Sequence, residues 1–261
     1  GITEPFEVQK ESIPDSLLGR DVCCRAPTGS GKTLAFGLPL IARTKRANPK
    51  RPTGLILTPT RELAEQINSV LRPIALAVDR DVVSIYGGVS YKKQYNALNK
   101  GVDILVACPG RLIDLLDRRA LKLDDVETVV LDEADRMADM GFMDPVCEIL
   151  DKCSNERQTI LFSATLDDDV ADLVKNYQNE PVTIEVGPKE VSIENMQHLF
   201  WTMKPHQKLG VTSEILAKCG KTMIFCKTRR GVDRLGNEMY DAEMNVSTLH
   251  GGLNQRQRDR A

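Results

Sequence analysis

The sequence predicts an α/β domain over residues 1–186, with a parallel sheet that is covered by helices on both faces. Short, unbroken apolar segments recur along this region, and segments of helical periodicity separate them. Unbroken apolar strands are typical of parallel sheets that are buried on both faces. Residue types suited to ligand binding directly follow several of these segments. Because ligands of such sheets bind at the carboxyl ends of the strands, the sequence predicts a site there.

The expected strands are short, and each of the first three ends at a proline or a glycine pair, which are typical strand terminators. A helix is expected from Arg61 to Leu71, because apolar residues recur there at helical spacing. Another helix is expected after Gly110. In chain order, the strands are expected at residues 55–57, 82–86, 104–107, 129–131 and 159–162.

Residues 187–195 are expected to form a linker, because the stretch is polar and contains Gly187-Pro188, which interrupts regular structure. A second series of strands and helices follows. Residues 196–261 are too few for a domain like the first, so a partial second domain is expected, with the chain ending inside a helix. Its expected elements are strands at residues 222–226 and 246–249 and a helix from Gly231 to Tyr240.

Composition and charge limit the classes of function. The chain has 261 residues, of which 41% are hydrophobic, and a net charge of -2, so a nucleic-acid site would have to be a local patch. Its seven cysteines form no Cys-x-x-Cys pair, which argues against a disulfide framework or a zinc site. No apolar stretch approaches the roughly 20 residues that span a bilayer, and the start lacks a signal-peptide pattern. We therefore expect a cytoplasmic protein without membrane contact.

A phosphate-binding loop is predicted at residues 26–33, in a G-x-x-x-x-G-K-[ST] pattern with Ala26 in the place of the first glycine. Gly29 and Gly31 let the main chain curl and point its N–H groups at phosphate oxygens. A helix that begins near Lys32 would add its N-terminal dipole. Lys32 would contact the β- and γ-phosphates, and the Thr33 hydroxyl would bind Mg²⁺. The expected nucleotide-binding residues of the loop are Ala26, Pro27, Thr28, Gly29, Ser30, Gly31, Lys32 and Thr33.

Two acidic residues follow the apolar segment at residues 129–131. Asp132 can hold the same Mg²⁺ as Thr33 from across the sheet. Glu133 is placed to orient or deprotonate an attacking water. A glycine-rich turn and an unrelated acidic strand end are the alternative. The two motifs together favour a site for ATP and Mg²⁺, with Lys32, Asp132 and Glu133 as the catalytic residues.

Three motifs taken together resemble those of one family. They are the phosphate loop, Asp132-Glu133-Ala134-Asp135 and Ser163-Ala164-Thr165, and the chain resembles the DEAD-box RNA helicases of helicase superfamily 2 along its whole length. The resemblance implies two RecA-like domains of the P-loop NTPase class, joined by a short linker, with ATP between them and RNA across both. It further implies that ATP binding closes the cleft and bends one RNA strand, and that hydrolysis reopens the cleft.

The same resemblance implies an RNA-binding surface. Arg61 and Arg111 each follow a strand end and can contact phosphate oxygens, while the main chain at Gly88 and Gly110 can do so without charge. Ordinary helix caps and turns are the alternative. Cys108 replaces a threonine of the family and would weaken one phosphate contact. The implied RNA-binding residues are Pro59, Thr60, Arg61, Gly88, Pro109, Gly110, Arg111, Thr228, Arg229, Gln255 and Arg258.

Further motifs fit the same resemblance. Gln9, between Pro5 and Ile13-Pro14, resembles the family's glutamine motif, and its amide can both donate to and accept from one adenine edge. Ser163 and Thr165 are implied to couple the γ-phosphate site to RNA through hydrogen bonds to Asp135. His250 has no partner histidine at ligand spacing, so a structural or RNA-proximal role is expected.

The chain ends before the family's last two motifs, whose arginines reach the γ-phosphate. Such arginines contribute roughly 10³–10⁵ in rate in phosphoryl-transfer enzymes. We therefore expect a fragment that binds nucleotide weakly, hydrolyses it very slowly and does not unwind RNA. A monomer is expected, with protein partners recruited through tails outside this sequence. The partial second domain is expected to expose apolar surface and to fold poorly alone.

Two other functions stay open. One is a DNA-directed helicase or translocase on the same fold, although the Asp-Glu-Ala-Asp sequence and Gln9 favour RNA. The other is an RNA clamp that uses ATP only to close. Glu133 argues against a clamp, because a clamp can dispense with its catalytic base.

Overall fold

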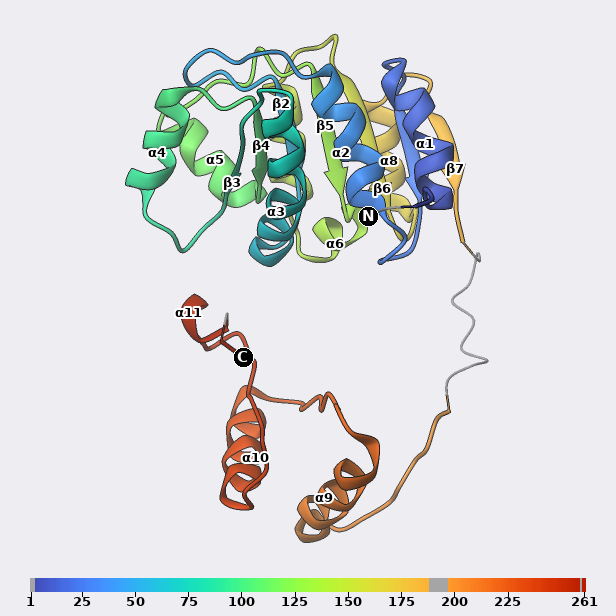
Figure 1. Cartoon of the computed structure of the whole chain (residues 1–261), viewed down its shortest axis with the longest axis vertical. Coiled ribbons are helices and arrows are strands. Elements are labelled where there is room, and N and C mark those ends of the chain that lie inside the picture. Colours follow the sequence, from blue (N-terminus) through green and yellow to red (C-terminus); the bar gives the residue numbers. More distant parts are fainter. Residues whose placement is uncertain (1–2, 188–196, 259) are drawn as a thin grey trace. The chain divides into compact units, whose positions relative to one another are not determined.

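The computed structural model, shown in Figure 1, describes residues 3–187, 197–258 and 260–261. The chain divides into two compact units, Gly1–Glu190 and Val191–Ala261. The expected linker at residues 187–195 lies, apart from residue 187, outside the described residues.

Unit 1 contains one sheet of seven parallel strands in the order β3-β4-β2-β5-β6-β1-β7. All five strands expected from the sequence are present to within one or two residues. The sheet has two further strands, one before the phosphate loop and one at an edge. The strands are β1 Val22–Arg25, β2 Gly54–Leu57, β3 Val82–Ile85, β4 Ile104–Ala107, β5 Thr128–Asp132, β6 Gln158–Ser163 and β7 Val182–Glu185.

Eight helices of unit 1 are described, and Figure 1 shows them on both sides of the sheet. The helix expected from Arg61 to Leu71 continues to Ala77, with Pro73 inside it, and Ala75 is buried against the core. The helices are α1 Glu7–Leu17, α2 Lys32–Arg43, α3 Arg61–Ala77, α4 Tyr91–Lys100, α5 Pro109–Asp117, α6 Ala134–Asp139, α7 Met143–Asp151 and α8 Asp168–Tyr177.

The sheet separates two hydrophobic clusters, because successive side chains of a strand point to opposite faces. In β5, Val129 and Leu131 pack with residues of α4 to α8, whereas Val130 packs with residues of α1, α2 and α3. Phe162 on the second face meets Phe36 of α2 edge to face, with ring centroids 5.6 Å apart. Burial on both faces explains why the strands are apolar throughout, and it confirms the predicted parallel α/β fold.

Unit 2 contains the helices α9 Lys208–Cys219, α10 Arg229–Asp241 and α11 Gln255–Arg258, after a short 3₁₀ turn at Pro205–Gln207. The helix expected from Gly231 to Tyr240 is therefore confirmed. The strands expected at residues 222–226 and 246–249 are wrong: both segments are irregular, and no strand occurs among the described residues of this unit. A strand needs a neighbour for its main-chain hydrogen bonds, and the described part of unit 2 supplies none. The chain also does not end inside a helix, because α11 stops at Arg258.

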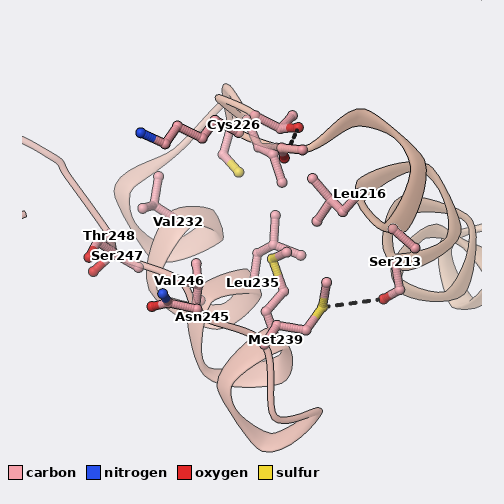
Figure 2. Close-up of a pocket in the computed structure, with 17 residues that line it drawn as sticks. Ser213, Leu216, Cys226, Val232, Leu235, Met239, Asn245, Val246, Ser247 and Thr248 are labelled. Carbon is pink, nitrogen blue, oxygen red and sulfur yellow. Dashed lines mark hydrogen bonds between the residues drawn. The ribbon is translucent and has the colours of Figure 1, made fainter.

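The two irregular segments and the helices α9 and α10 surround a cavity of about 580 Å³. Figure 2 shows Leu216, Leu235 and Met239 pointing into it. On the same irregular segments, Met223 is 78% exposed and Phe225 is 89% exposed. The apolar surface expected for a partial second domain is therefore present within unit 2.

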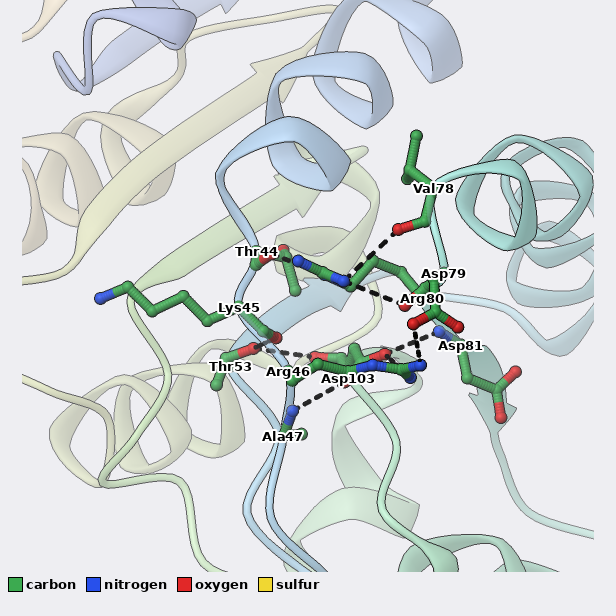
Figure 3. Close-up of polar contacts among 10 residues, drawn as sticks. All are labelled: Thr44, Lys45, Arg46, Ala47, Thr53, Val78, Asp79, Arg80, Asp81 and Asp103. Atoms are coloured by element: carbon green, nitrogen blue, oxygen red, sulfur yellow. Dashed lines mark hydrogen bonds and ion pairs between the residues drawn. The ribbon is translucent and has the colours of Figure 1, made fainter.

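One buried carboxylate holds together the connections at the amino ends of the strands (Figure 3). Asp103 directly precedes β4, and its side chain accepts the main-chain N–H groups of Ala47 at 2.7 Å and Asp81 at 2.8 Å. Its carbonyl oxygen accepts the N–H groups of Thr53 and Gly54 at 3.1 and 3.0 Å. Asp103 thus fixes the entries into β2 and β3 relative to β4.

We expect Asp103→Asn to lower the free energy of unfolding by about 2 kcal/mol, because one main-chain N–H then faces an amide NH₂ in place of the oxygen of a buried carboxylate. The matched control is Asp79→Asn, which removes an 84% exposed carboxylate that pairs with Arg46 and should change stability by less than about 0.5 kcal/mol. Urea unfolding followed by circular dichroism measures both. Equal effects of the two substitutions would contradict the role of Asp103.

Candidate active site

The phosphate loop connects β1 to α2. The Ala26 N–H donates to the Ser163 carbonyl at 2.9 Å, and α2 then begins at Lys32, as the sequence predicts. Gly29 and Gly31 have φ angles of +83° and +92°, which L side chains rarely adopt. A Cβ on Gly31 would also lie 2.7 Å from Gln9 Nε2 and from Phe6 Cδ2, so this glycine also permits close packing.

Lys32 and Asp132 form the charged centre of the site. Lys32 is 8% exposed, and its Nζ lies 3.4 Å from the Ala26 carbonyl oxygen. Asp132 ends β5, is 3% exposed, and its Oδ1 has no hydrogen-bond partner. Burial raises the pKa of Asp132 to about 7, the positive charge of Lys32 opposes this rise, and the negative charge of Glu133 adds to it.

A buried carboxylate oxygen without a partner is a suitable ligand for a hard divalent cation. Thr33 lies in the first turn of α2, and its hydroxyl is the group that we expect from the sequence to bind the same cation as Asp132. Among the described residues, no group of three or more histidine, cysteine, aspartate or glutamate side chains could hold a metal ion. A cation here would therefore need phosphate and water oxygens as further ligands, which is how Mg²⁺ is commonly bound.

Glu133 lies between β5 and α6 in a left-handed conformation, with φ 55° and ψ 53°. This conformation is uncommon for a residue other than glycine, and such strained residues concentrate at functional sites. It reverses the chain directly after Asp132, so that α6 can begin at Ala134. Glu133 is half-buried and therefore in partial contact with solvent at the carboxyl end of the sheet.

The expected coupling residues are only partly brought together. Ser163 Oγ accepts the main-chain N–H of Asp135 at 3.1 Å, so these two residues are connected. The expectation that Thr165 also bonds to Asp135 is wrong. Its hydroxyl donates to Asp167 at 3.3 Å, because Thr165 has already left the sheet and Asp167 caps the following helix α8.

Gln9 is buried and its amide makes two contacts within the protein. Its Oε1 accepts the Phe6 N–H at 3.0 Å, and its Nε2 donates to the Gly31 carbonyl at 3.0 Å. Gln9 therefore connects the start of α1 to the phosphate loop. The contact between Phe6 and the loop could not be predicted from the sequence, because the two segments are far apart along the chain.

Arg61 and Gly88, two of the expected RNA-binding residues, lie together. Arg61 begins α3, and its guanidinium lies so close to Gly88 that a Cβ there would collide with it. Thr60 accepts the Leu63 N–H at 3.3 Å and so caps α3, which is the structural alternative considered for it. Pro59, before it, is buried.

Arg111 supports this same region from α5. Its guanidinium donates to the Val89 carbonyl at 3.2 Å and to Gln94 Oε1 at 3.0 Å, and it stacks on the Tyr91 ring at 4.3 Å from the centroid. The side chain is 10% exposed, so Arg111 positions the loop after Gly88 in this structure.

Pro109 and Gly110 form the first turn of α5, after Cys108 at its N-cap. Pro109 is buried and Gly110 is exposed. The Cys108 side chain makes no capping hydrogen bond. Burial raises the pKa of its thiol to about 12, so Cys108 is neutral near pH 7 and carries no charge that would repel a phosphate.

In unit 2, the expected motif around Thr228 and Arg229 lies close to the one around His250 and Gly251. Thr228 caps α10 by accepting the Gly231 N–H at 3.0 Å, and the Arg229 guanidinium lies beside Gly251. His250 Nε2 contacts Asp233 Oδ1 at 2.8 Å, while its Nδ1 accepts the Gly252 N–H at 3.1 Å. Both ring nitrogens of His250 thus have structural partners, in line with the structural role considered for it. Gln255 and Arg258 lie on α11.

Comparison with known proteins identifies the family. Residues 6–173 match the DEAD/DEAH box helicase family. The chain belongs to this family. It is 39% identical over 270 residues to "DEAD-box ATP-dependent RNA helicase 9" of Oryza sativa subsp. japonica, covering 100% of this chain and 42% of that protein. It is 36% identical over 260 residues to "DEAD-box ATP-dependent RNA helicase CshA" of Streptococcus pneumoniae, covering 99% of this chain and 49% of that protein.

Solved structures agree with this membership. A hypothetical ATP-dependent RNA helicase from Sulfolobus tokodaii superposes with a TM-score of 0.67 at 36% identity, covering 91% of this chain and 69% of that one. A DEAD box protein from Methanococcus jannaschii gives a TM-score of 0.67 at 31% identity, covering 98% and 69%. These matches confirm the RecA-like class predicted for the fold. The chain spans two fifths to half the length of the two DEAD-box relatives described above.

In the absence of nucleotide and divalent cations, we expect Asp132→Asn to raise the free energy of unfolding at pH 8 by on the order of 2 kcal/mol, because it removes a buried charge without a full set of partners. The wild-type carboxyl has a higher pKa in the folded state, about 7, than the ordinary value of about 4. The wild-type protein therefore loses stability as the pH rises through this range.

The difference in free energy of unfolding between Asp132→Asn and the wild type should shrink as the pH falls from 8 toward 4, because the wild-type carboxyl then takes up a proton. Urea unfolding at several pH values measures it. Asp172→Asn, at an exposed position in α8, is the control and should leave stability within about 0.5 kcal/mol at each pH. A destabilised Asp132→Asn variant at pH 8 would contradict the burial argument.

Proposed function

We propose that this chain is the nucleotide-binding part of an ATP-dependent RNA helicase, which hydrolyses ATP with Mg²⁺ and separates short RNA duplexes. The observation that carries the proposal is the buried Asp132 Oδ1 at the carboxyl end of the sheet, which has no hydrogen-bond partner and feels the positive charge of Lys32. Family membership and the names of the relatives support RNA as the nucleic acid.

The loop residues and the acids have separate tasks in this proposal. The N–H groups around Gly29 and Gly31 bind the phosphates, and Lys32 neutralises the β- and γ-phosphates. Asp132 and Thr33 would hold Mg²⁺, which supplies charge neutralisation at the phosphates. Glu133, which follows Asp132 directly, orients the attacking water and accepts its proton.

RNA would be bound through its backbone. Arg61 lies beside Gly87-Gly88, and Arg111 holds the loop that follows. The positively charged Arg61 guanidinium is therefore positioned next to a main-chain segment without side chains. Contacts to phosphate and sugar bind RNA with little sequence specificity. Protein partners, the monomeric state and the cytoplasmic location remain predictions of the sequence. No helix among the described residues is long and apolar enough to cross a membrane.

Substituting Glu133→Gln should lower the ATP hydrolysis rate by roughly 10²–10⁴-fold, because the general base is lost, while ATP affinity changes less than about threefold. Hydrolysis with and without RNA is measured on this chain and on any longer form of the protein that carries it. Glu148→Gln on α7, which removes only an exposed carboxylate that pairs with Lys152, is the control and should leave the rate unchanged.

The same assay distinguishes the alternatives. Equal stimulation by single-stranded DNA and by RNA would favour a DNA-directed translocase. ATP-dependent RNA retention that persists without turnover would favour a clamp. An unchanged rate in Glu133→Gln, where the wild-type protein does hydrolyse ATP, would contradict the role of Glu133.

Gly88→Ala should weaken RNA binding by about tenfold, because the new methyl group displaces the Arg61 guanidinium and the backbone φ of +86° disfavours alanine. Fluorescence anisotropy with labelled RNA measures the affinity. Gly141→Ala is the matched control: φ is +71°, and its Cβ would meet nothing within 4 Å. Equal losses of RNA affinity in both variants would show that backbone strain, and not the displacement of Arg61, is responsible.

A further inference from the structure

A tyrosine ring restrains the arginine that holds residues 87–90, the glycine loop between β3 and α4. Tyr91 is the first residue of α4, and the Arg111 guanidinium lies 4.3 Å from the centre of its ring. A second guanidinium, that of Arg118 at the end of α5, lies 4.7 Å from the same centre. The electron-rich face of an aromatic ring attracts such cations. Tyr91 therefore limits the positions that the long Arg111 side chain can take.

The ring is itself held in place through its hydroxyl group. The Tyr91 hydroxyl donates to Asp114 Oδ2 at 2.6 Å, and Arg118 Nε donates to Asp114 Oδ1 at 2.7 Å. Arg111 Nε lies 3.7 Å from Oδ2 of the same carboxylate. Asp114 therefore faces both guanidinium groups, whose like charges would repel each other without it, and it also fixes the direction of the Tyr91 ring.

Arg111 connects this cluster to the glycine loop. Its guanidinium donates to the Val89 carbonyl at 3.2 Å and to Gln94 Oε1 at 3.0 Å. Gln94 is buried, and its Nε2 donates at 3.0 Å to the carbonyl of Tyr86, the residue directly before the loop. The loop is therefore fixed at both ends, at Tyr86 through Gln94 and at Val89 through Arg111.

The position of the glycine loop decides which groups a phosphate can contact together. Gly88 packs so closely against the Arg61 guanidinium that a Cβ on this glycine would collide with it. A loop that moved away would separate the main chain at Gly88 from this cation. A phosphate of the RNA backbone could then no longer contact both.

We propose that Tyr91 is a positioning residue for RNA binding, which acts through Arg111. Arg111 holds the glycine loop, and the loop presents Gly88 beside Arg61. The inference rests on the proposed RNA-binding function and adds to it a residue that lies outside the motifs found in the sequence. Tyr91 makes no contact with RNA in this proposal, because its ring is occupied by the two guanidinium groups of α5.

Fluorescence anisotropy with labelled single-stranded RNA, at one fixed salt concentration, measures the affinity of the chain in the wild type and in two variants of Tyr91. Tyr91→Leu should weaken RNA binding by about tenfold, because Arg111 loses the ring that restrains it. Tyr91→Phe keeps the ring and should bind RNA within about threefold of the wild type. Mg-ATP affinity, measured by isothermal titration calorimetry, should stay within about twofold in both variants, because the phosphate loop is unchanged.

Tyr177 in α8 offers a matched control, because it makes the same two kinds of contact. Its hydroxyl donates to Asp151 at 3.1 Å, and the Arg157 guanidinium lies 5.9 Å from the centre of its ring. Tyr177 lines a cavity with Asp21, which directly precedes β1, whereas the glycine loop follows the carboxyl end of β3. Tyr177→Leu removes a comparable ring at the other end of the sheet and should leave RNA affinity unchanged.

A double-mutant cycle tests whether Tyr91 acts through Arg111. Arg111→Gln should weaken RNA binding at least as much as Tyr91→Leu does. Adding Tyr91→Leu to Arg111→Gln should then weaken binding by no more than about twofold further, because the guanidinium that the ring restrains is already absent.

Four results would overturn the proposal. Unchanged RNA affinity in Tyr91→Leu would show that Arg111 does not need the ring. Effects of Tyr91→Leu and Arg111→Gln that multiply in the double variant would show that the ring acts independently of this arginine. Equal losses of RNA and ATP affinity in Tyr91→Leu would show that the ring only stabilises the domain. A wild-type chain that binds Mg-ATP but no RNA would overturn the proposed RNA-binding function itself, and that result is distinct from the other three.

Discussion

The site of unit 1 depends on the register of three neighbouring parallel strands. Asp132 of β5 pairs with Phe162 of β6, and Arg25 of β1 pairs with Ser163, so the strands end side by side. Ser163 then makes contacts in both directions: its carbonyl oxygen accepts the Ala26 N–H, and its hydroxyl accepts the Asp135 N–H. One residue of β6 thus connects the phosphate loop to the acidic segment, although these lie about a hundred residues apart in the chain.

The two ends of the sheet use buried carboxylates in opposite ways. Asp103 at the amino end accepts two main-chain N–H groups and so stabilises the fold. Asp132 at the carboxyl end has an oxygen without a partner, and the residue after it is held in a left-handed conformation. A buried polar group without partners costs stability, and proteins keep such groups where a ligand uses them. This contrast supports the proposal that the nucleotide binds at the carboxyl end of the sheet, while Asp103 stabilises the amino end.

Much of this could be predicted from sequence, because apolar strands and the turn residues after them are local patterns. The loop at residues 26–33 and Asp132 lie where those patterns indicate. The contacts of Thr165, Gln9 and Arg111 could not be predicted, because each depends on which segments pack together in three dimensions. The strands expected at residues 222–226 and 246–249 failed for a related reason. Their sequences suit a strand, but strand formation also requires a hydrogen-bonding neighbour.

The small residues of the phosphate loop are required for different physical reasons. Gly29 needs only its positive φ, since a Cβ there would meet nothing within 4 Å. Gly31 needs both its positive φ and the absence of a side chain, because Gln9 and Phe6 pack against it. Ala26 needs neither: it has no positive φ and is buried in the core beside β1. A methyl group therefore fits at the first position of the pattern, whereas at Gly31 it would separate the loop from Gln9 and Phe6.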